Sequence, residues 1–201
     1  GRSRASLMEA MQVLHRFGGS PVGQAKLARE AGLANNTVAA GYLDLLGDLL
    51  CLGVAQAWDA SRRVRIARKP AKYHFINLLA AATWSPARLR SLADVRALPP
   101  EERGRWDEWL VAQEIWRRSA LLGAEEPEQL TFWQSRDHEI DFVLQPDLFV
   151  EVKHGRASPL EFTWFPQCFP GARLLVVNRE QFEAGPIRGV TMEDFLLGGW
   201  E

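Results

Sequence analysis

The sequence has few of the features that would set it apart from ordinary water-soluble globular proteins. It contains only two cysteines, Cys51 and Cys168, without metal-ligand spacing or a disulfide pattern, which indicates reduced thiols with a structural or incidental role. No apolar run approaches the roughly 20 residues needed to cross a membrane, and no signal peptide is visible. We therefore expect a cytoplasmic protein that does not associate with membranes.

A phosphate-binding loop of the form G-x-x-x-x-G-K-[ST] is also missing, so we expect no ATP site in this chain. The 201 residues suffice for one large or two small domains. The net charge of −1 conceals a split. Up to Ile76 there are 11 Lys and Arg against 5 Asp and Glu, and the remainder has 13 against 20. This asymmetry suggests two units with different partners.

The first unit has the pattern of a helix-turn-helix. Apolar residues at helical spacing predict helices over Ala5–Phe17, Gln24–Ala31 and from Asn35 or Asn36 to about Leu46. A small-residue turn at Gly32 joins the second helix to the third. The expected buried seam consists of Leu27, Ala28, Leu33, Val38 and Leu43.

Two strands are predicted next, over Leu49–Trp58 and Arg62–Arg68, joined by Asp59-Ala60-Ser61. Together with the three helices they predict a winged helix-turn-helix over residues 1–76.

A basic stretch covers the second of these strands and continues beyond it. Six cations without an acid fall in one window of 11 residues: Arg62, Arg63, Arg65, Arg68, Lys69 and Lys72. Such a stretch suits a phosphate backbone. The third helix offers Asn35, Asn36, Thr37 and Tyr42 to a groove but no Arg or Lys, so we expect contact with DNA mainly through its backbone. The alternative is a protein-contact module whose basic wing is a solvated edge.

A connector over residues 77–100 is expected to lead into a second, α/β unit over residues 101–201. Pro99-Pro100 precedes a predicted helix from Glu101 to about Ala120, with acids in its first turn. A strand is predicted over Leu130–Ser135, and the unbroken apolar run Arg173–Val177 predicts a buried strand. The whole chain is thus predicted to be α/β (α+β), with a mixed central sheet flanked by helices.

The most informative stretch is a predicted β-hairpin with an acidic face. The runs Glu139–Leu144 and Leu148–Lys153 alternate apolar and charged residues around Gln145-Pro146-Asp147. If these three residues form the loop, Leu144 faces Leu148, Asp141 faces Glu151, and Glu139 faces Lys153. A register shift of one residue would place apolar and charged side chains together on both faces of the hairpin, so the alternation predicts this register.

Like charges about 5 Å apart repel unless a cation neutralises them. Oxygen ligands with few protein donors suit magnesium, so Asp141 and Glu151 are candidate ligands of Mg²⁺ or Mn²⁺. Lys153, two residues after Glu151 on the same face, could then stand beside a metal-bound water or stabilise charge on phosphorus. The simpler alternative is a surface hairpin with a Glu139–Lys153 ion pair.

Several of these motifs are similar to those of a known family. FWQSRDHEIDFVL followed by LFVEVK resembles the core of the PD-(D/E)XK, restriction-endonuclease-like fold. More narrowly, it resembles the C-terminal region of uncharacterised function in a group of bacterial and archaeal AAA-type ATPases. The resemblance places Asp141 and Glu151 on the metal-binding acids and Lys153 on the motif lysine. It implies an ATPase module upstream of this chain.

The resemblance extends to two further segments. KPAKYHFINLLAAA is similar to the family's connecting strand, with Asn77 where aspartate is usual. GRWDEWLVAQE resembles a family helix, which implies that Glu108 completes the metal shell, whereas Glu114 is expected at the surface.

Two functions of different classes follow. The first is a magnesium-dependent phosphodiester hydrolase acting on DNA, with Asp141, Glu151, Lys153 and Glu108 as its catalytic residues. The second is a non-catalytic module that binds nucleic acid or protein and regulates an ATPase, and the acidic balance of the C-terminal half favours it. A homodimer is compatible with either function.

Overall fold

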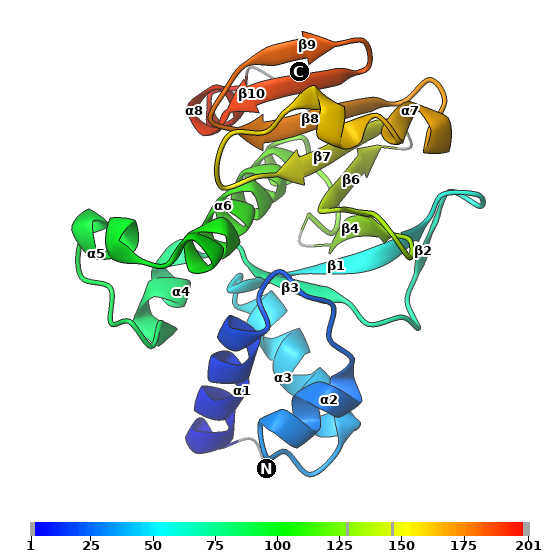
Figure 1. Cartoon of the computed structure of the whole chain (residues 1–201). Coiled ribbons are helices and arrows are strands. Elements are labelled where there is room, and N and C mark those ends of the chain that lie inside the picture. The colour runs from blue at the N-terminus through cyan, green and yellow to red at the C-terminus, as the bar shows by residue number, and fades with distance from the viewer. Residues whose placement is uncertain (1–2, 128, 146, 199–201) are drawn as a thin grey trace.

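A computed structural model describes residues 3–127, 129–145 and 147–198. Within this part of the chain, eight α-helices and two mixed β-sheets form an α+β fold. In Figure 1 the first three helices lie at the bottom, one sheet crosses the middle, and the second sheet lies at the top. The predicted fold class is thereby confirmed at the level of an α+β protein.

Three helices open the chain: α1 (Arg4–Arg16), α2 (Gln24–Glu30) and α3 (Asn36–Asp48). Asn35 caps α3 by accepting a hydrogen bond from the Val38 N–H at 3.0 Å, as expected for an asparagine just before a helix. The turn before it uses Gly32 at φ 59°, where a residue with a Cβ would be strained. All three predicted helices are present, with ends within two residues of the prediction.

One member of the expected seam is misplaced. Val38 is 37% exposed, whereas Ala39, Tyr42, Leu43 and Leu46 of α3 are buried. These four recur at intervals of three and four residues along one face of the helix, and Val38 lies off that face.

The first sheet follows the helices. Strand β1 (Leu52–Asp59) pairs antiparallel with β2 (Val64–Ile66) and with β3 (Lys72–Phe75). On its other edge β1 pairs parallel with β4 (Gln129–Gln134), from Val54↔Gln129 to Ala57↔Phe132. The predicted units 1–76 and 101–201 therefore share one sheet.

The connector contains two helices, α4 (Leu78–Trp84) and α5 (Leu92–Ala97). Helix α4 was not predicted, because the whole segment KPAKYHFINLLAAA was expected to resemble a connecting strand. The strand ends at Phe75, and the Asn77 side chain accepts a hydrogen bond from the Ala80 N–H at 3.1 Å. An asparagine in this position starts a helix rather than extending a strand.

The long helix α6 (Pro100–Leu121) crosses between the two sheets in Figure 1. Trp109 and Val111 are fully buried on it, whereas Trp106 and Trp116 are only partly buried. Helix α6 contributes to two hydrophobic clusters, with Trp109 in the N-terminal cluster and Val111, Ala112 and Ile115 in a central one. It thereby packs both predicted units together.

The second sheet has the order β6-β7-β8-β10-β9. Its strands are β6 (Phe142–Gln145), β7 (Leu148–Val152), β8 (Arg173–Asn178), β9 (Phe182–Ala184) and β10 (Ile187–Thr191). Strands β7, β8 and β10 are parallel, and β6 and β9 run antiparallel to their neighbours. A 3-10 helix (Pro159–Phe162), α7 (Phe165–Cys168) and α8 (Met192–Leu196) accompany this sheet.

The hairpin register is predicted correctly for the residue pairs next to Asp141 and Glu151. Phe142 pairs with Val150 and Val143 with Phe149, but the register shifts before Gln145, which pairs with Leu148. The expected Leu144–Leu148 pair is therefore replaced, and Pro146 of the predicted loop lies outside the described residues. None of the helices in the described ranges combines the length and apolar character needed to span a membrane.

Candidate functional site

The predicted acids Asp141 and Glu151 lie side by side. Asp141 stands at the bend between β5 (Glu139–Ile140) and β6, and Glu151 is near the end of β7. The Asp141 N–H donates to Glu151 Oε2 at 3.3 Å, and the Val152 N–H donates to Asp141 Oδ2 at 3.0 Å. Lys153 Nζ lies 2.7 Å from Glu151 Oε1, with 41% of the lysine side chain exposed. Paired backbone strands therefore fix the acid–acid–lysine set.

Glu139 does not face Lys153 as expected. The chain bends at Asp141, so that β5 leaves the hairpin and pairs with β4, placing Glu139 opposite Gln134. The Glu139 carboxylate contacts the Lys72 ammonium group instead. Strict alternation along one straight strand was the wrong assumption, because the strand is interrupted at Asp141.

Two further charged groups complete the cluster. Glu108 is buried on α6, and Lys72, at the start of β3, has a side chain that is 0% exposed. Lys72 Nζ lies 2.9 Å from Asp141 Oδ1 and 3.5 Å from Glu108 Oε1. Glu108 thus lies in the same cluster as Asp141 and Glu151, and Lys72 links it to Asp141.

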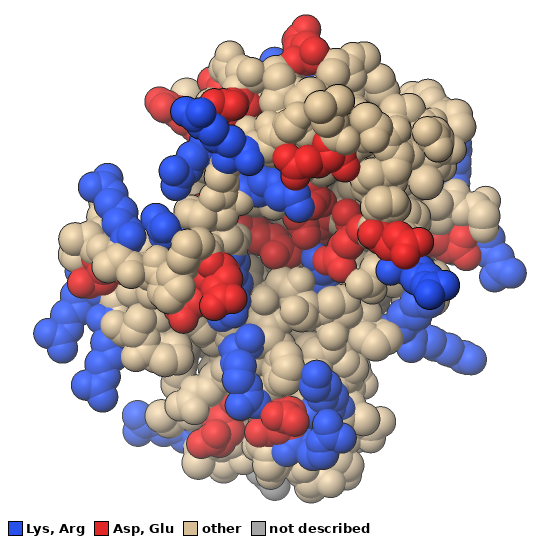
Figure 2. All heavy atoms as spheres, viewed as in Figure 1, with Lys and Arg blue, Asp and Glu red and all other residues tan. Residues whose placement is uncertain are grey.

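An open cleft of about 440 Å³ is lined by Glu108, Glu139, Asp141, Glu151 and Lys153, and its other wall is the loop Gly18-Gly19-Ser20 after α1. Lys72 is fully buried and contacts three of these acids without lining the cleft. Figure 2 shows acidic atoms gathered in a hollow at the centre of this face. Gly19 has φ 79°, and a Cβ on it would come within 2.7 Å of Glu108 Oε2. Only glycine lets the loop pass this close to the carboxylate.

Burial and like charge shift the pKa values of the cluster. Burial, and then the charge of Asp141, raise the pKa of Glu108 to about 8, and the same two causes raise the pKa of Glu151 to about 8. Burial also disfavours the Asp141 carboxylate, but the Lys72 charge and the hydrogen bonds it accepts hold its pKa below the ordinary value. The cluster therefore contains more carboxyl groups than its two lysine ammonium groups can neutralise.

Carboxylate oxygens of this kind fit a hard divalent cation in donor type and in charge. Glu108, Asp141 and Glu151 come from three different elements, and their cleft is open to solvent. Within the described ranges, however, no three His, Cys, Asp or Glu side chains are arranged so that they could hold a metal ion. At Asp141 and Glu108, carboxylate oxygens contact the Lys72 ammonium group.

The six cations of the basic stretch, residues 62–72, divide into an exposed group and one buried lysine. Five are exposed on or beside the β1–β2 hairpin: Arg62, Arg63, Arg65, Arg68 and Lys69. Figure 2 shows Lys and Arg side chains at its right edge, where Figure 1 places β2. Lys72 does not lie with them, because β3 is buried and the lysine points into the acid cluster. The expectation that it contacts nucleic acid is therefore corrected.

The start of α3 exposes Asn36 and Thr37 as expected. Tyr42 is not available to a groove, since its side chain is buried and its hydroxyl oxygen accepts a hydrogen bond from the Ser3 N–H at 2.8 Å. Glu114 was expected at the surface and is buried on α6, where Arg117 and Arg118 each donate to its carboxylate. An acid three and four residues before two arginines was the sequence signal for that arrangement.

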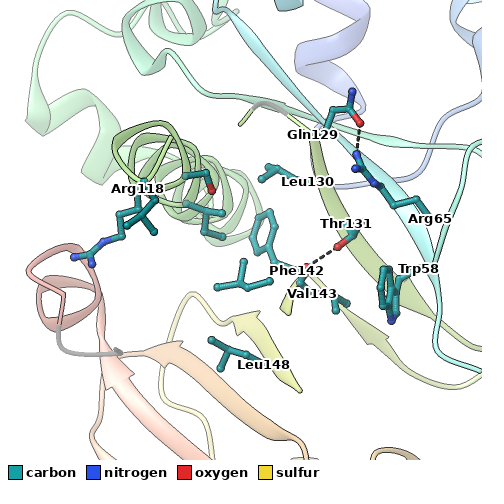
Figure 3. Close-up of a pocket in the computed structure, with 13 residues that line it drawn as sticks. Trp58, Arg65, Arg118, Gln129, Leu130, Thr131, Phe142, Val143 and Leu148 are labelled. Carbon is teal, nitrogen blue, oxygen red and sulfur yellow. Dashed lines mark hydrogen bonds between the residues drawn. The ribbon is translucent and has the colours of Figure 1, made fainter. Parts of the chain in front are cut away.

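A second hollow, of about 330 Å³, opens between α6, β4 and β6 (Figure 3). Its lining is largely apolar, with Phe142, Leu130 and Leu148 among its residues. The Thr131 hydroxyl donates to the Val143 carbonyl at 2.5 Å and is thereby satisfied within the protein. No cluster of opposed charges lines this hollow in the described part of the chain, so the acidic cleft is the better candidate site.

Comparison of the chain with protein-family models, with curated proteins and with solved structures finds no match. The resemblance to the ATPase-associated family therefore stays a prediction.

Proposed function

We propose that the chain is a metal-dependent phosphodiester hydrolase that acts on DNA. The observation that carries this proposal is the meeting of Glu108, Asp141, Glu151 and Lys153 in one open cleft. The sequence separates the first of these from the last by 45 positions, and three elements bring them together. A surface hairpin with one ion pair would not need an acid from α6 at the same place.

The proposed fold assignments draw on the order of elements. Helices α1, α2 and α3 followed by antiparallel β1, β2 and β3 support a winged helix-turn-helix. Helix α6, the β6–β7 hairpin and the parallel pair β7–β8 support a PD-(D/E)XK-like second part. The shared strand pair β1–β4 would connect the basic hairpin to the cleft through one continuous sheet.

Three acids and one lysine of the cleft have a role in this proposal. Asp141 and Glu151, with Glu108, would hold Mg²⁺ or Mn²⁺. A bound divalent cation supplies stabilisation of charge on the phosphate and lowers the pKa of water. The Lys153 ammonium group, partly exposed beside Glu151, would pair with the phosphate during reaction. The exposed arginines of the hairpin would hold the DNA backbone.

Partners and location follow as parts of the same proposal. We expect DNA as substrate, an ATPase module upstream of this chain, and a cytoplasmic location. A homodimer would let two clefts cut two strands.

Cleavage of duplex DNA with Mg²⁺ or Mn²⁺ tests the proposal. We expect Asp141→Asn to lower the rate by on the order of 100-fold or more, because it removes a ligand charge. Asp137→Asn is the matched control, since Asp137 is exposed four residues earlier in the chain, and it should leave the rate unchanged. A wild-type protein that cuts no DNA with either metal would refute the hydrolase.

A second candidate is the non-catalytic binding module. One observation favours it: Lys72 already lies within ion-pair distance of Glu108, Glu139 and Asp141. If this module is the function, neither metal should promote cleavage, and both the wild type and Asp141→Asn should still bind DNA.

A further inference from the structure

Lys72 was expected among the exposed cations of the basic stretch, but it lies in the acid cluster. It comes from β3, in the N-terminal part of the chain, and its backbone pairs with Ala55 of β1. Its ammonium group reaches three carboxylates supplied by α6, β5 and the bend at Asp141. The acidic site is therefore assembled from both predicted units.

Among the described residues, the charged partners of the Lys72 ammonium group are these three acids. The side chain is fully buried, and apart from the acids Nζ lies over the Phe132 ring at 5.5 Å from its centroid. Next on the same face is His74, also fully buried, whose two ring nitrogens have no hydrogen-bond partner among the described residues. His74 Nδ1 lies 3.6 Å from Glu108 Oε1. Burial, and then the Lys72 charge, lower the His74 pKa to about 3, so the ring is neutral.

A buried ammonium group is costly unless carboxylates compensate it, and the same carboxylates repel one another without it. Lys72 and a divalent cation would thus perform the same task, which is to neutralise Glu108 and Asp141. Two cations close together repel strongly in a partly buried site. The oxygens that contact Lys72 are those the proposed metal needs.

We propose that Lys72 is a positioning residue of the cleft, whose ammonium group holds Glu108, Glu139 and Asp141 together and competes with a divalent cation for Glu108 and Asp141. The inference rests on the proposed metal site but not on hydrolysis of DNA. It explains why the acids gather around Nζ instead of forming a coordination shell. It also gives the N-terminal part a role within the site.

The test measures Mn²⁺ binding by calorimetry and thermal unfolding with and without Mn²⁺, on the full chain. Lys72→Met keeps the length of the side chain and removes its charge. We expect this variant to bind Mn²⁺ more tightly than the wild type by on the order of tenfold or more. Its melting temperature should fall without metal and recover with Mn²⁺. Lys69→Met, an exposed lysine three residues earlier, should match the wild type in both measurements.

A folded Lys72→Met protein that binds Mn²⁺ no more tightly than the wild type would overturn the proposal. If Lys72→Met does not fold even with Mn²⁺, the double variant Lys72→Met/Glu139→Gln decides, because it removes one charge of each sign. Tighter binding of Mn²⁺ by the folded double variant supports the proposal. Unchanged or weaker binding overturns it, as does failure of the double variant to fold, which would show that Lys72 does more than neutralise acids.

The proposed metal-dependent hydrolase can be refuted independently of the role of Lys72. Binding of Mn²⁺ by Lys72→Met but not by the wild type would support the role of Lys72 and refute a working metal site in the natural chain. Absence of binding in both proteins would refute both proposals.

Discussion

The exposed β1–β2 hairpin and the acid cluster both use cations of the basic stretch, residues 62–72, but in different ways. Arg62 and Arg68 reach solvent from the hairpin, whereas Lys72 turns inward and meets three carboxylates. A charge in solvent contributes little to folding, and a buried charge strongly constrains its neighbours. We therefore expect changes in the cleft to alter stability and metal binding, and changes in the hairpin to alter DNA binding alone.

Outside the acid cluster, the largest effect on the free energy of unfolding is expected at His15, in the last turn of α1. Its side chain is buried against Trp106, Trp109 and Phe75, and Nε2 has no hydrogen-bond partner in the part of the chain that the structure describes. Burial, and then the charge of Arg105, lower the His15 pKa from 6.5 to about 4. The folded state thus takes up its proton at a lower pH than the unfolded state.

Because the unfolded state binds more protons between pH 6.5 and 4, His15 makes the free energy of unfolding fall as pH falls through this range. We expect a loss on the order of 2 to 3 kcal/mol. Urea unfolding at pH 7 and pH 4 would measure it in the wild type and in His15→Leu, which lacks the titrating group. An equal loss in both proteins would contradict the prediction.

A smaller effect on the free energy of unfolding is expected at Gly19, where the loop Gly18-Gly19-Ser20 approaches the Glu108 carboxylate. Gly19→Ala introduces a Cβ at positive φ within 2.7 Å of Glu108 Oε2, and we expect a loss of about 1 to 2 kcal/mol in unfolding free energy. The displaced carboxylate should also weaken Mn²⁺ binding, as calorimetry can measure.

Gly32→Ala is the matched control for Gly19→Ala. Gly32 also has positive φ, at 59°, but no atom lies within 4 Å of the position of its added Cβ. This variant should lose stability from backbone strain alone and keep the wild-type affinity for Mn²⁺. Equal metal affinity in both variants would show that the wall does not position Glu108.

The smallest effect on stability is expected in the hairpin. Arg62→Ala/Arg68→Ala should change the unfolding free energy by less than about 0.5 kcal/mol, since both side chains are exposed. If both contact phosphates, the slope of log affinity against log salt should become shallower by about 2. Fluorescence anisotropy with a labelled duplex would measure this slope. The exposed pair Arg4→Ala/Arg96→Ala should leave it unchanged.

Local patterns predicted much of the fold and part of the site. The helices α1, α2, α3 and α6 and the strands β1, β4 and β8 occur close to their predicted positions, because helical spacing and apolar runs depend on neighbours in sequence. The hairpin register around Phe142 and Val150 was also predictable, since a slip would reverse its two faces. Strand pairing then brings Asp141 and Glu151 together.

The bend at Asp141 and the partners of Glu139 and Lys72 were decided by tertiary structure. Glu139 changes strands because β5 pairs with β4, a contact that depends on the approach of the first sheet. By sequence alone, Lys72 is one more cation in a basic stretch. By itself the sequence determined which charges are available and which short segments become helices and strands. Only the packing of α6 and the first sheet against the hairpin decided which charges are buried together, because that proximity joins residues 36 and 69 positions apart.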